Sequence, residues 1–294
     1  TLEVFYEPDH ATANLRGKLR YIEDLYGNRL TCNYDGSGNL DYVIDAAGHY
    51  FRYNYLASGD NAGKLEFVRA FKDSGTSDPG LIARIDFTYQ DSIPTYHNEV
   101  GATGDLIRVD VKTHKTGETG TIFSIIRTTH YRYWDGAHNG STQMGNAHTL
   151  KAIITPEHYS RAATALGGAP EAAADTSVDD YYSYYFEYDA TDRVTLQSVA
   201  AGLASGVGCC GGGGGGAGLE SYILSYDTQV NTTRNDWAVR TKIQHNGTTR
   251  YVETNNWGEV FRDILFTTDD SNSEPVWVRQ YDRDSAGRLT HFYS

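Results

Sequence analysis

Glycine recurs at a nearly constant interval early in the chain, and this interval limits the fold more than any other feature. The glycines are Gly17, Gly27, Gly38 and Gly48, ten or eleven residues apart. Between them lie stretches of alternating character, such as residues 30–34 and 40–44. A strand of roughly five to seven residues and a turn of about four residues make up one such step. The interval therefore predicts consecutive antiparallel β-hairpins.

The residues around each glycine explain the turns. Asp24 precedes Gly27 and Asp45 precedes Gly48 by three residues. An aspartate can accept backbone N–H groups of a turn, and glycine tolerates the positive φ that a tight hairpin requires. An apolar residue two places after the glycine, such as Leu40, is expected to begin the next strand on its buried face. The same pattern recurs at Gly247, Gly258 and Gly287.

The middle of the chain departs from this period. Residues 81–89, 105–112 and 121–134 are predicted to be longer strands. The segment 155–180 is predicted to be a helical insertion, which is short and lies near 155–175. Thr155 suits an N-cap, Pro156 the first helical position, and Gly167-Gly168 a stop after Leu166.

These patterns predict an all-β fold in which consecutive antiparallel β-hairpin repeats form a curled sheet. Composition agrees, since 23 of the 294 residues are tyrosine and only one is methionine. Tyrosine suits a pleated, half-buried surface. We expect one domain over residues 1–294, interrupted by the helical insertion and by a glycine-rich segment at 206–218.

Charge and hydropathy exclude several classes of partner. The chain has 25 Lys and Arg against 38 Asp and Glu, a formal net charge of −13. Nucleic-acid affinity comes largely from cations that neutralise phosphates, so no nucleic-acid partner is expected. No run of 18 apolar residues occurs, so no membrane span is predicted. The chain begins at Thr1, which suggests a mature or excised fragment.

Tyr-Asp pairs carry a family resemblance. They are Tyr34-Asp35, Tyr188-Asp189, Tyr226-Asp227 and Tyr281-Asp282. Residues 281–290, Tyr-Asp followed by four residues and Gly-Arg-Leu-Thr, resemble the YD repeats of Rhs proteins and teneurins. The chain looks like a diverged, bacterial-type member or fragment of that family. The resemblance implies a β-sheet that spirals into a shell, in secreted or surface proteins that encapsulate toxins, mediate adhesion or form surface material.

The sequence contains no signature of catalysis. The sequence contains no His-Glu-x-x-His, Gly-x-Ser-x-Gly or phosphate-loop motif. We therefore predict no enzyme activity, no cofactor and no metal. Four histidines are the nearest approach to a cluster, and they are expected to be surface or loop residues: His130, His138, His148 and His158. Residues 35–41 resemble the start of a calcium loop, but Leu40 replaces its sixth-position glycine, which favours a turn.

Three cysteines are too few for a disulfide framework. Cys32 lies in a strand pattern and is expected to be buried. Cys209 and Cys210 adjoin the glycine run, where they could pair with another subunit or stay free or locally paired. The chain also has three N-glycosylation sequons in expected loops: Asn139, Asn231 and Asn246.

Tyrosine clusters at residues 50–55 and 181–186 leave two interpretations. They could be sugar-binding platforms, but their alternation favours cross-strand ladders.

The leading hypothesis is a non-catalytic, tyrosine-rich structural protein of the cell surface or exterior. It would assemble with copies of itself into a fibre, sheath or shell, because open repeat sheets expose strand edges. The alternatives are an adhesion or glycan-binding module and a fragment of a toxin-encapsulating Rhs shell.

Overall fold

The computed structural model describes residues 1–72, 80–92, 98–114, 123–200, 219–267 and 274–294. The chain divides into two compact units. The first contains residues 1–131 and 155–173, and the second contains residues 132–154 and 174–294. That the units make up one domain stays a prediction.

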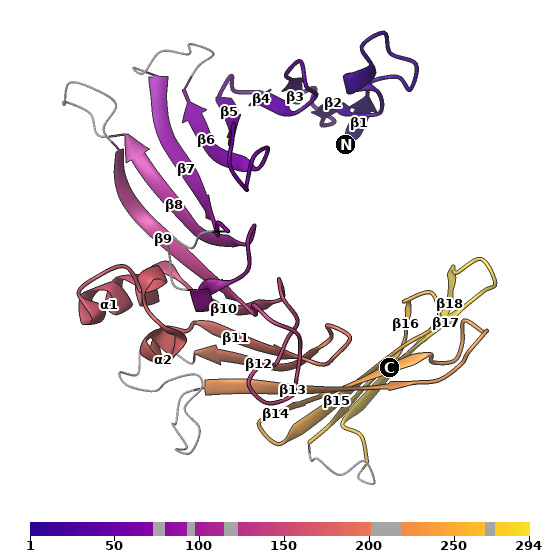
Figure 1. Cartoon of the computed structure of the whole chain (residues 1–294). Coiled ribbons are helices and arrows are strands. Elements are labelled where there is room, and N and C mark those ends of the chain that lie inside the picture. Colours follow the sequence, from indigo (N-terminus) through magenta and orange to yellow (C-terminus); the bar gives the residue numbers. More distant parts are fainter. Residues whose placement is uncertain (73–79, 93–97, 115–122, 201–218, 268–273) are drawn as a thin grey trace. The chain divides into compact units, whose positions relative to one another are not determined.

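The described residues of the first unit form nine strands, each antiparallel to the next (Figure 1). They are β1 (Leu2–Phe5), β2 (Leu19–Glu23), β3 (Arg29–Tyr34), β4 (Leu40–Ile44), β5 (Tyr50–Tyr55), β6 (Leu65–Phe71), β7 (Leu81–Tyr89), β8 (Leu106–His114) and β9 (Phe123–Tyr133), whose last two residues belong to the second unit. Strand β7 has the predicted bounds. The predictions for β8 and β9 were wrong by only one or two residues at each end.

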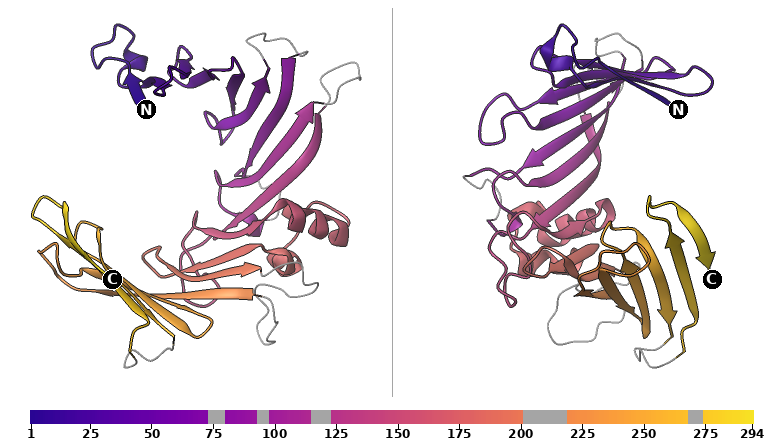
Figure 2. Two further views of the ribbon diagram at one scale, coloured as in Figure 1. Left: turned by 180° about the vertical axis from the view of Figure 1, so that it is seen from behind. Right: turned by 90° about the vertical axis from the view of Figure 1, so that its right-hand side faces the viewer.

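The second unit continues the same arrangement with nine antiparallel strands. They are β10 (Leu150–Ile154), β11 (Tyr184–Tyr188), β12 (Val194–Ala200), β13 (Leu219–Thr228), β14 (Val239–His245), β15 (Thr248–Thr254), β16 (Val260–Phe266), β17 (Trp277–Arg283) and β18 (Leu289–Tyr293). Figure 2 shows β14 to β18 side by side in this order. The all-β fold of consecutive hairpins is confirmed, and the curl stays a prediction.

The predicted turn glycines all have positive φ. Gly27, Gly38 and Gly48 have φ of 82°, 87° and 84°, and Gly287 has 85°. This backbone region penalises residues that carry a Cβ. At Gly27 and Gly48 the turn conformation alone favours glycine, since nothing would contact a Cβ there. At Gly38 and Gly287 crowding adds to it, because a Cβ would lie 3.0 Å from the Asn14 carbonyl oxygen and 2.8 Å from Arg234 Nη1, respectively.

The expectation that the residue two places after each glycine is buried was only partly correct. Tyr50 is 7% exposed, but Leu289 is 53% exposed. Tyr50 packs against Phe71 and Leu81. Strand β18, which contains Leu289, has a single ladder among those described in the second unit, so no further strand covers it.

The first helix of the insertion begins and ends as predicted. Helix α1 (Pro156–Leu166) starts after Thr155 and ends at Gly167, whose φ is 63°. A 3-10 turn (Pro170–Ala172), helix α2 (Asp175–Val178) and a second 3-10 turn (Asp179–Tyr181) follow. The return to strand occurs at Tyr184, later than the tyrosine-rich sequence from residue 179 suggested.

Burial is limited to small clusters along the sheets. In the first unit Tyr42 stacks on Tyr50, with ring centroids 4.7 Å apart. Cys32 is 5% exposed, which confirms its predicted burial. Among the described residues, no helix is long and apolar enough to cross a membrane.

Candidate functional site

Two of the four Tyr-Asp motifs, those of Asp35 and Asp189, begin a hydrogen-bonded turn, whereas Asp227 and Asp282 lie within strands. Asp35 shows the geometry of the turn. The Asp35 N–H donates to the Asn39 carbonyl at 2.8 Å, and the Gly38 N–H donates to the Asp35 carbonyl at 3.0 Å. The Asp35 carboxylate accepts the N–H groups of Ser37 and Asn39 at 2.9 and 2.8 Å. The bond from the Asn39 backbone lowers the pKa of Asp35. The carboxylate therefore caps the backbone N–H groups of the turn.

Six turns in the described chain share this pair of backbone hydrogen bonds. They span residues 24–28, 35–39, 45–49, 189–193, 255–259 and 284–288. Two of them vary the motif. Asn255 replaces the aspartate, and its side-chain oxygen accepts the N–H groups of Trp257 and Glu259. Asp192 replaces the glycine and has φ of 63°. The backbone geometry thus persists where the sequence motif diverges.

A second recurring contact lies at the end of a strand pair that is opposite to the connection between the two strands. The hydroxyl groups of four tyrosines donate to the carbonyl of the first residue of the preceding strand. The pairs are Tyr34 to Leu19, Tyr55 to Leu40, Tyr188 to Leu150 and Tyr226 to Val194, at 2.7 to 2.9 Å. We call these four hydrogen bonds the tyrosine ties. Burial raises the pKa of all four hydroxyl groups.

The ties also occur where no tight turn connects the strands. Strands β10 and β11 are connected through the helical insertion, yet Tyr188 closes their open end. Strands β12 and β13 are connected through residues 201–218, and Tyr226 closes their open end. The tie therefore holds a strand pair independently of the length of its connection.

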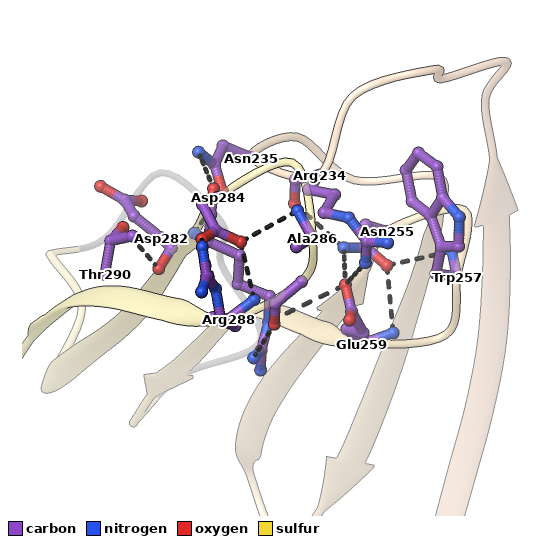
Figure 3. A network of polar contacts seen from close by, with 12 residues as sticks. Arg234, Asn235, Asn255, Trp257, Glu259, Asp282, Asp284, Ala286, Arg288 and Thr290 are labelled. Atoms are coloured by element: carbon purple, nitrogen blue, oxygen red, sulfur yellow. Dashed lines mark hydrogen bonds and ion pairs between the residues drawn. The ribbon is translucent and has the colours of Figure 1, made fainter.

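A cluster of polar residues joins two turns of the second unit to the loop at residues 231–236. We call it the turn cluster, and Figure 3 shows Asn235 beside the turn of Asp284 and Arg234 beside the turn of Asn255. The Asn235 amide pairs with both backbone groups of Arg283, at 2.7 and 3.0 Å. The Asn255 amide donates to the Arg234 carbonyl at 3.0 Å. These bonds clamp the loop onto both turns.

Charge in the turn cluster centres on Glu259. Its carboxylate lies 2.6 Å from Arg234 Nη1, and it accepts the Asn255 amide at 2.8 Å. The Asn255 hydrogen bond and the neighbouring arginines lower the pKa of Glu259. The Arg234 guanidinium also lies 4.4 Å from the ring centroid of Trp257, whose exposed fraction is 50%.

A row of alternating charges crosses the strands of the second unit. Asp227, Arg240, Glu253, Arg262 and Gln280 are direct cross-strand neighbours from β13 to β17. Glu253 is 0% exposed and lies 2.6 Å from Arg240 and 2.8 Å from Arg262. Opposite charges on facing positions stabilise neighbouring strands. Hydrogen bonds from both arginines compensate the buried carboxylate.

In the first unit a similar network anchors the helical insertion. Arg108 on β8 contacts Asp110 at 2.7 Å and Glu171 at 2.6 Å. Glu171 is 1% exposed and also accepts the Tyr159 hydroxyl at 2.9 Å. Burial and the adjacent Glu171 charge raise the pKa of Tyr159. These contacts hold residues 159–171 against the strands of that unit.

The first and last strands expose apolar side chains. In β1 Leu2 and Phe5 are 56% and 51% exposed. In β18 all five residues are exposed, and Phe292 and Tyr293 are 51% and 52% exposed. Within its own unit each of these strands has one described ladder, β1 with β2 and β18 with β17.

The four histidines of the predicted cluster lie in different environments. His130 was expected at the surface, but it is 0% exposed, and its Nδ1 lies 2.7 Å from the Ile107 carbonyl. The alternation of β9 turns this side chain inward. His148 is exposed, whereas His138 and His158 are half-buried. In the described parts of the chain, no three His, Cys, Asp or Glu side chains are grouped to hold a metal ion.

The predicted modification sites lie in different environments. Asn139 and Asn246 are exposed, in loops. Asn231 is 9% exposed, and its amide donates to the carbonyls of Thr233 and Asp236. Cys209 and Cys210, with the glycine-rich segment 206–218, lie outside the described residues.

The tyrosine clusters show both buried and bonded side chains. Tyr50 is 7% exposed, and the Tyr55 hydroxyl donates to Leu40. Tyr182 and Tyr185 stack with a centroid distance of 6.2 Å. Sequence reasoning missed the tyrosine ties and the turn cluster, because both depend on strand register and loop docking.

Comparison with known proteins gives no family assignment. No protein-family model matches the sequence, and no curated protein matches it significantly. A crystal structure of TcdB2-TccC3 is similar over 98% of this chain, with 11% identity and a TM-score of 0.25. A structure of the Photorhabdus luminescens Tc holotoxin pore, with a mutated TccC3, covers 94% of this chain, with 11% identity and a TM-score of 0.21.

This chain spans 17% and 16% of the lengths of those two structures. At such TM-scores the likeness supports no conclusion about function.

Proposed function

We propose that the chain is a non-catalytic structural repeat protein of the cell surface or exterior, a building block of a fibre, sheath or shell. A shell of the Rhs type is one form of this role. The repetition of two kinds of contact supports the proposal: six turns with the same backbone hydrogen bonds and four tyrosine ties. Such repetition serves to build an extended sheet.

The proposal extends to self-assembly. Strand β18 of one copy would pair with β1 of the next and continue the antiparallel order. The two strands have similar lengths, five and four residues. Their exposed apolar residues, Phe292 and Tyr293 on one side and Leu2 and Phe5 on the other, would be covered by the pairing. Exposed strand edges with apolar side chains are templates for such addition.

Sedimentation velocity over a range of protein concentrations tests the assembly. We expect species that grow with concentration, and negative-stain electron microscopy should show filaments or sheets. Phe292→Lys should suppress growth, because a charged edge opposes strand addition. Ile223→Lys is the matched control, since Ile223 is 54% exposed but lies on β13, between β12 and β14.

A protein that stays monomeric at every concentration would overturn the assembly proposal. Equal suppression by both lysine variants would contradict the assignment of the contact to β18. Circular dichroism of both variants establishes that they are folded.

A further inference from the structure

Trp257 is the exposed one among the four tryptophans of the chain. It is 50% exposed, whereas Trp134 is 3% exposed and Trp237 and Trp277 are half-buried. Its backbone N–H donates to Asn255 Oδ1 at 3.0 Å, which places the residue in the turn of the turn cluster (Figure 3). An indole held at the surface in this way has apolar area that a ligand can cover.

Trp257 lines a pocket of about 360 Å³ in the second unit. The rest of the lining comes from two segments, residues 232–235 and residues 283–285. Both segments are held in place, because the Asn235 amide pairs with the backbone of Arg283 and the Asn255 amide donates to the Arg234 carbonyl. The pocket is therefore preorganised. Preorganised pockets with one aromatic side and a few polar groups are typical of small-molecule sites.

The charged side chains of the lining are already paired within the turn cluster. Arg234 and Arg283 lie 2.6 and 3.9 Å from Glu259, and Asp284 lies 2.8 Å from Arg288. Two further carboxylates of the same segments lie outside the lining, those of Asp236 and Asp282. The lining thus leaves no unpaired charge for a ligand to neutralise, and a neutral ligand fits it best.

Two hydroxyl groups of the lining are available to a ligand. Thr232 and Ser285 are exposed, and neither hydroxyl has a hydrogen-bond partner within the described residues. A hydroxyl both donates and accepts, so it suits a ligand whose polar groups are themselves hydroxyls. Arg234 lies 4.4 Å from the ring centroid of Trp257, and half of the tryptophan remains exposed beside it. The pocket therefore combines an apolar face with neutral hydroxyl groups at its rim.

We propose that this pocket binds a neutral saccharide through one pyranose ring. The C–H face of the ring packs on the exposed part of the Trp257 indole, and the ring hydroxyls exchange hydrogen bonds with Thr232 and Ser285. A pyranose whose hydroxyls are all equatorial presents C–H groups on both faces, so a ring of the glucose type fits best. The site goes beyond the structural role, because a monomer would bind the sugar as well as an assembly would.

Isothermal titration with cellobiose, a neutral disaccharide of two glucose rings, tests the site. Mannitol and caffeine are the comparison ligands, because mannitol has hydroxyl groups without a ring and caffeine has a flat ring without hydroxyl groups. We expect saturable binding of cellobiose, and binding of the other two that is weaker by about tenfold or more.

Two variants locate the contact. Trp257→Ala keeps the backbone of the turn and should weaken cellobiose by about tenfold or more. Phe292→Ala is its matched control, because Phe292 is an aromatic residue of the same unit that is 51% exposed and lies outside the pocket. Thr232→Trp fills the pocket from an exposed position and should abolish binding. Circular dichroism establishes that all three variants are folded.

Three results would overturn the proposal. They are no binding of cellobiose, equal binding of mannitol or caffeine, and an affinity that is unchanged in either Trp257→Ala or Thr232→Trp. None of these results depends on whether the chain assembles.

Discussion

The hydroxyl of Tyr188 donates to the carbonyl of Leu150 at 2.8 Å, although 38 residues separate the two along the chain. Tyr34 makes the same contact with Leu19 over 15 residues. The spatial relation is constant because each tyrosine lies at the end of one strand and its acceptor at the start of the preceding strand. The ties therefore depend on how the strands pair and not on the number of residues between the tyrosine and its acceptor.

Removal of one tie should destabilise the sheet measurably. Tyr188→Phe deletes the hydroxyl and leaves the Leu150 carbonyl without this donor, so we expect a loss of about 1 kcal/mol in the free energy of unfolding. Urea unfolding measures the change. Tyr26→Phe is the control, since Tyr26 is 91% exposed. Equal stability of the two variants would show that the tie contributes nothing.

Where a turn glycine has open space around it, backbone conformation should decide whether it can be replaced. Gly48→Ala meets no atom within 4 Å but forces alanine into φ of 84°, which should cost about 1 kcal/mol. Gly36→Ala, in the neighbouring turn, also meets no atom, and its φ is not positive. It should be neutral or slightly stabilising. Thermal unfolding of both variants makes the comparison.

The turn aspartates should make stability depend on acid pH. Hydrogen bonds from the turn backbone lower the pKa of Asp35 and Asp284 below the ordinary value of 3.8. A carboxyl whose pKa is lower in the folded state stabilises the fold above 3.8, and this stability is lost as pH falls through the folded pKa. Asp35→Asn should reduce the loss in the free energy of unfolding as pH falls below 3.8, the acid limb of the stability profile. An unchanged limb would contradict the assignment.

The tyrosine ties should make the stability of the fold depend on alkaline pH. Burial raises the pKa of Tyr34 and Tyr188 above 10.0. The neutral form is therefore favoured in the folded state, and its contribution is complete below pH 10.0 and lost as pH rises through the folded pKa. Urea midpoints measured on either side of pH 10.0 should fall on the alkaline side. Tyr188→Phe should show a smaller fall than the native chain.

The buried Glu253 should be among the most sensitive positions of the second unit. Glu253→Ala removes the shared partner of Arg240 and Arg262, whose side chains are 31% and 33% exposed. Solvent reaches the two freed arginines, so we expect a loss of about 2 kcal/mol, below the usual cost of breaking a fully buried pair. Glu220→Ala, at a side chain that is 51% exposed, is the control in the same denaturant experiment.

Much of the fold could be predicted from local signals. The turns at Gly27, Gly38 and Gly48 and the end of α1 at Gly167 follow from residues that tolerate positive φ. The register of the strands is not local, and for that reason the partner of Tyr188 was not predictable. His130 looked like a loop residue because its burial depends on which face of β9 is covered.

The turn cluster was missed for a different reason. Residues 231–236 have the composition of an ordinary loop, and their docking depends on two turns that lie more than 20 residues further along the chain. Trp257 and Arg283 have no sequence motif in common. Only the fold brings them to one pocket.

Because a tyrosine tie closes within one strand pair, the gain or loss of a whole pair breaks none of the ties in the neighbouring pairs. Gene duplication or deletion in steps of two strands would thus change the length of the sheet at little cost in stability. The connection inside a tied pair is equally free to vary, as the helical insertion between β10 and β11 illustrates. The architecture accommodates both a change in length and the acquisition of new inserts.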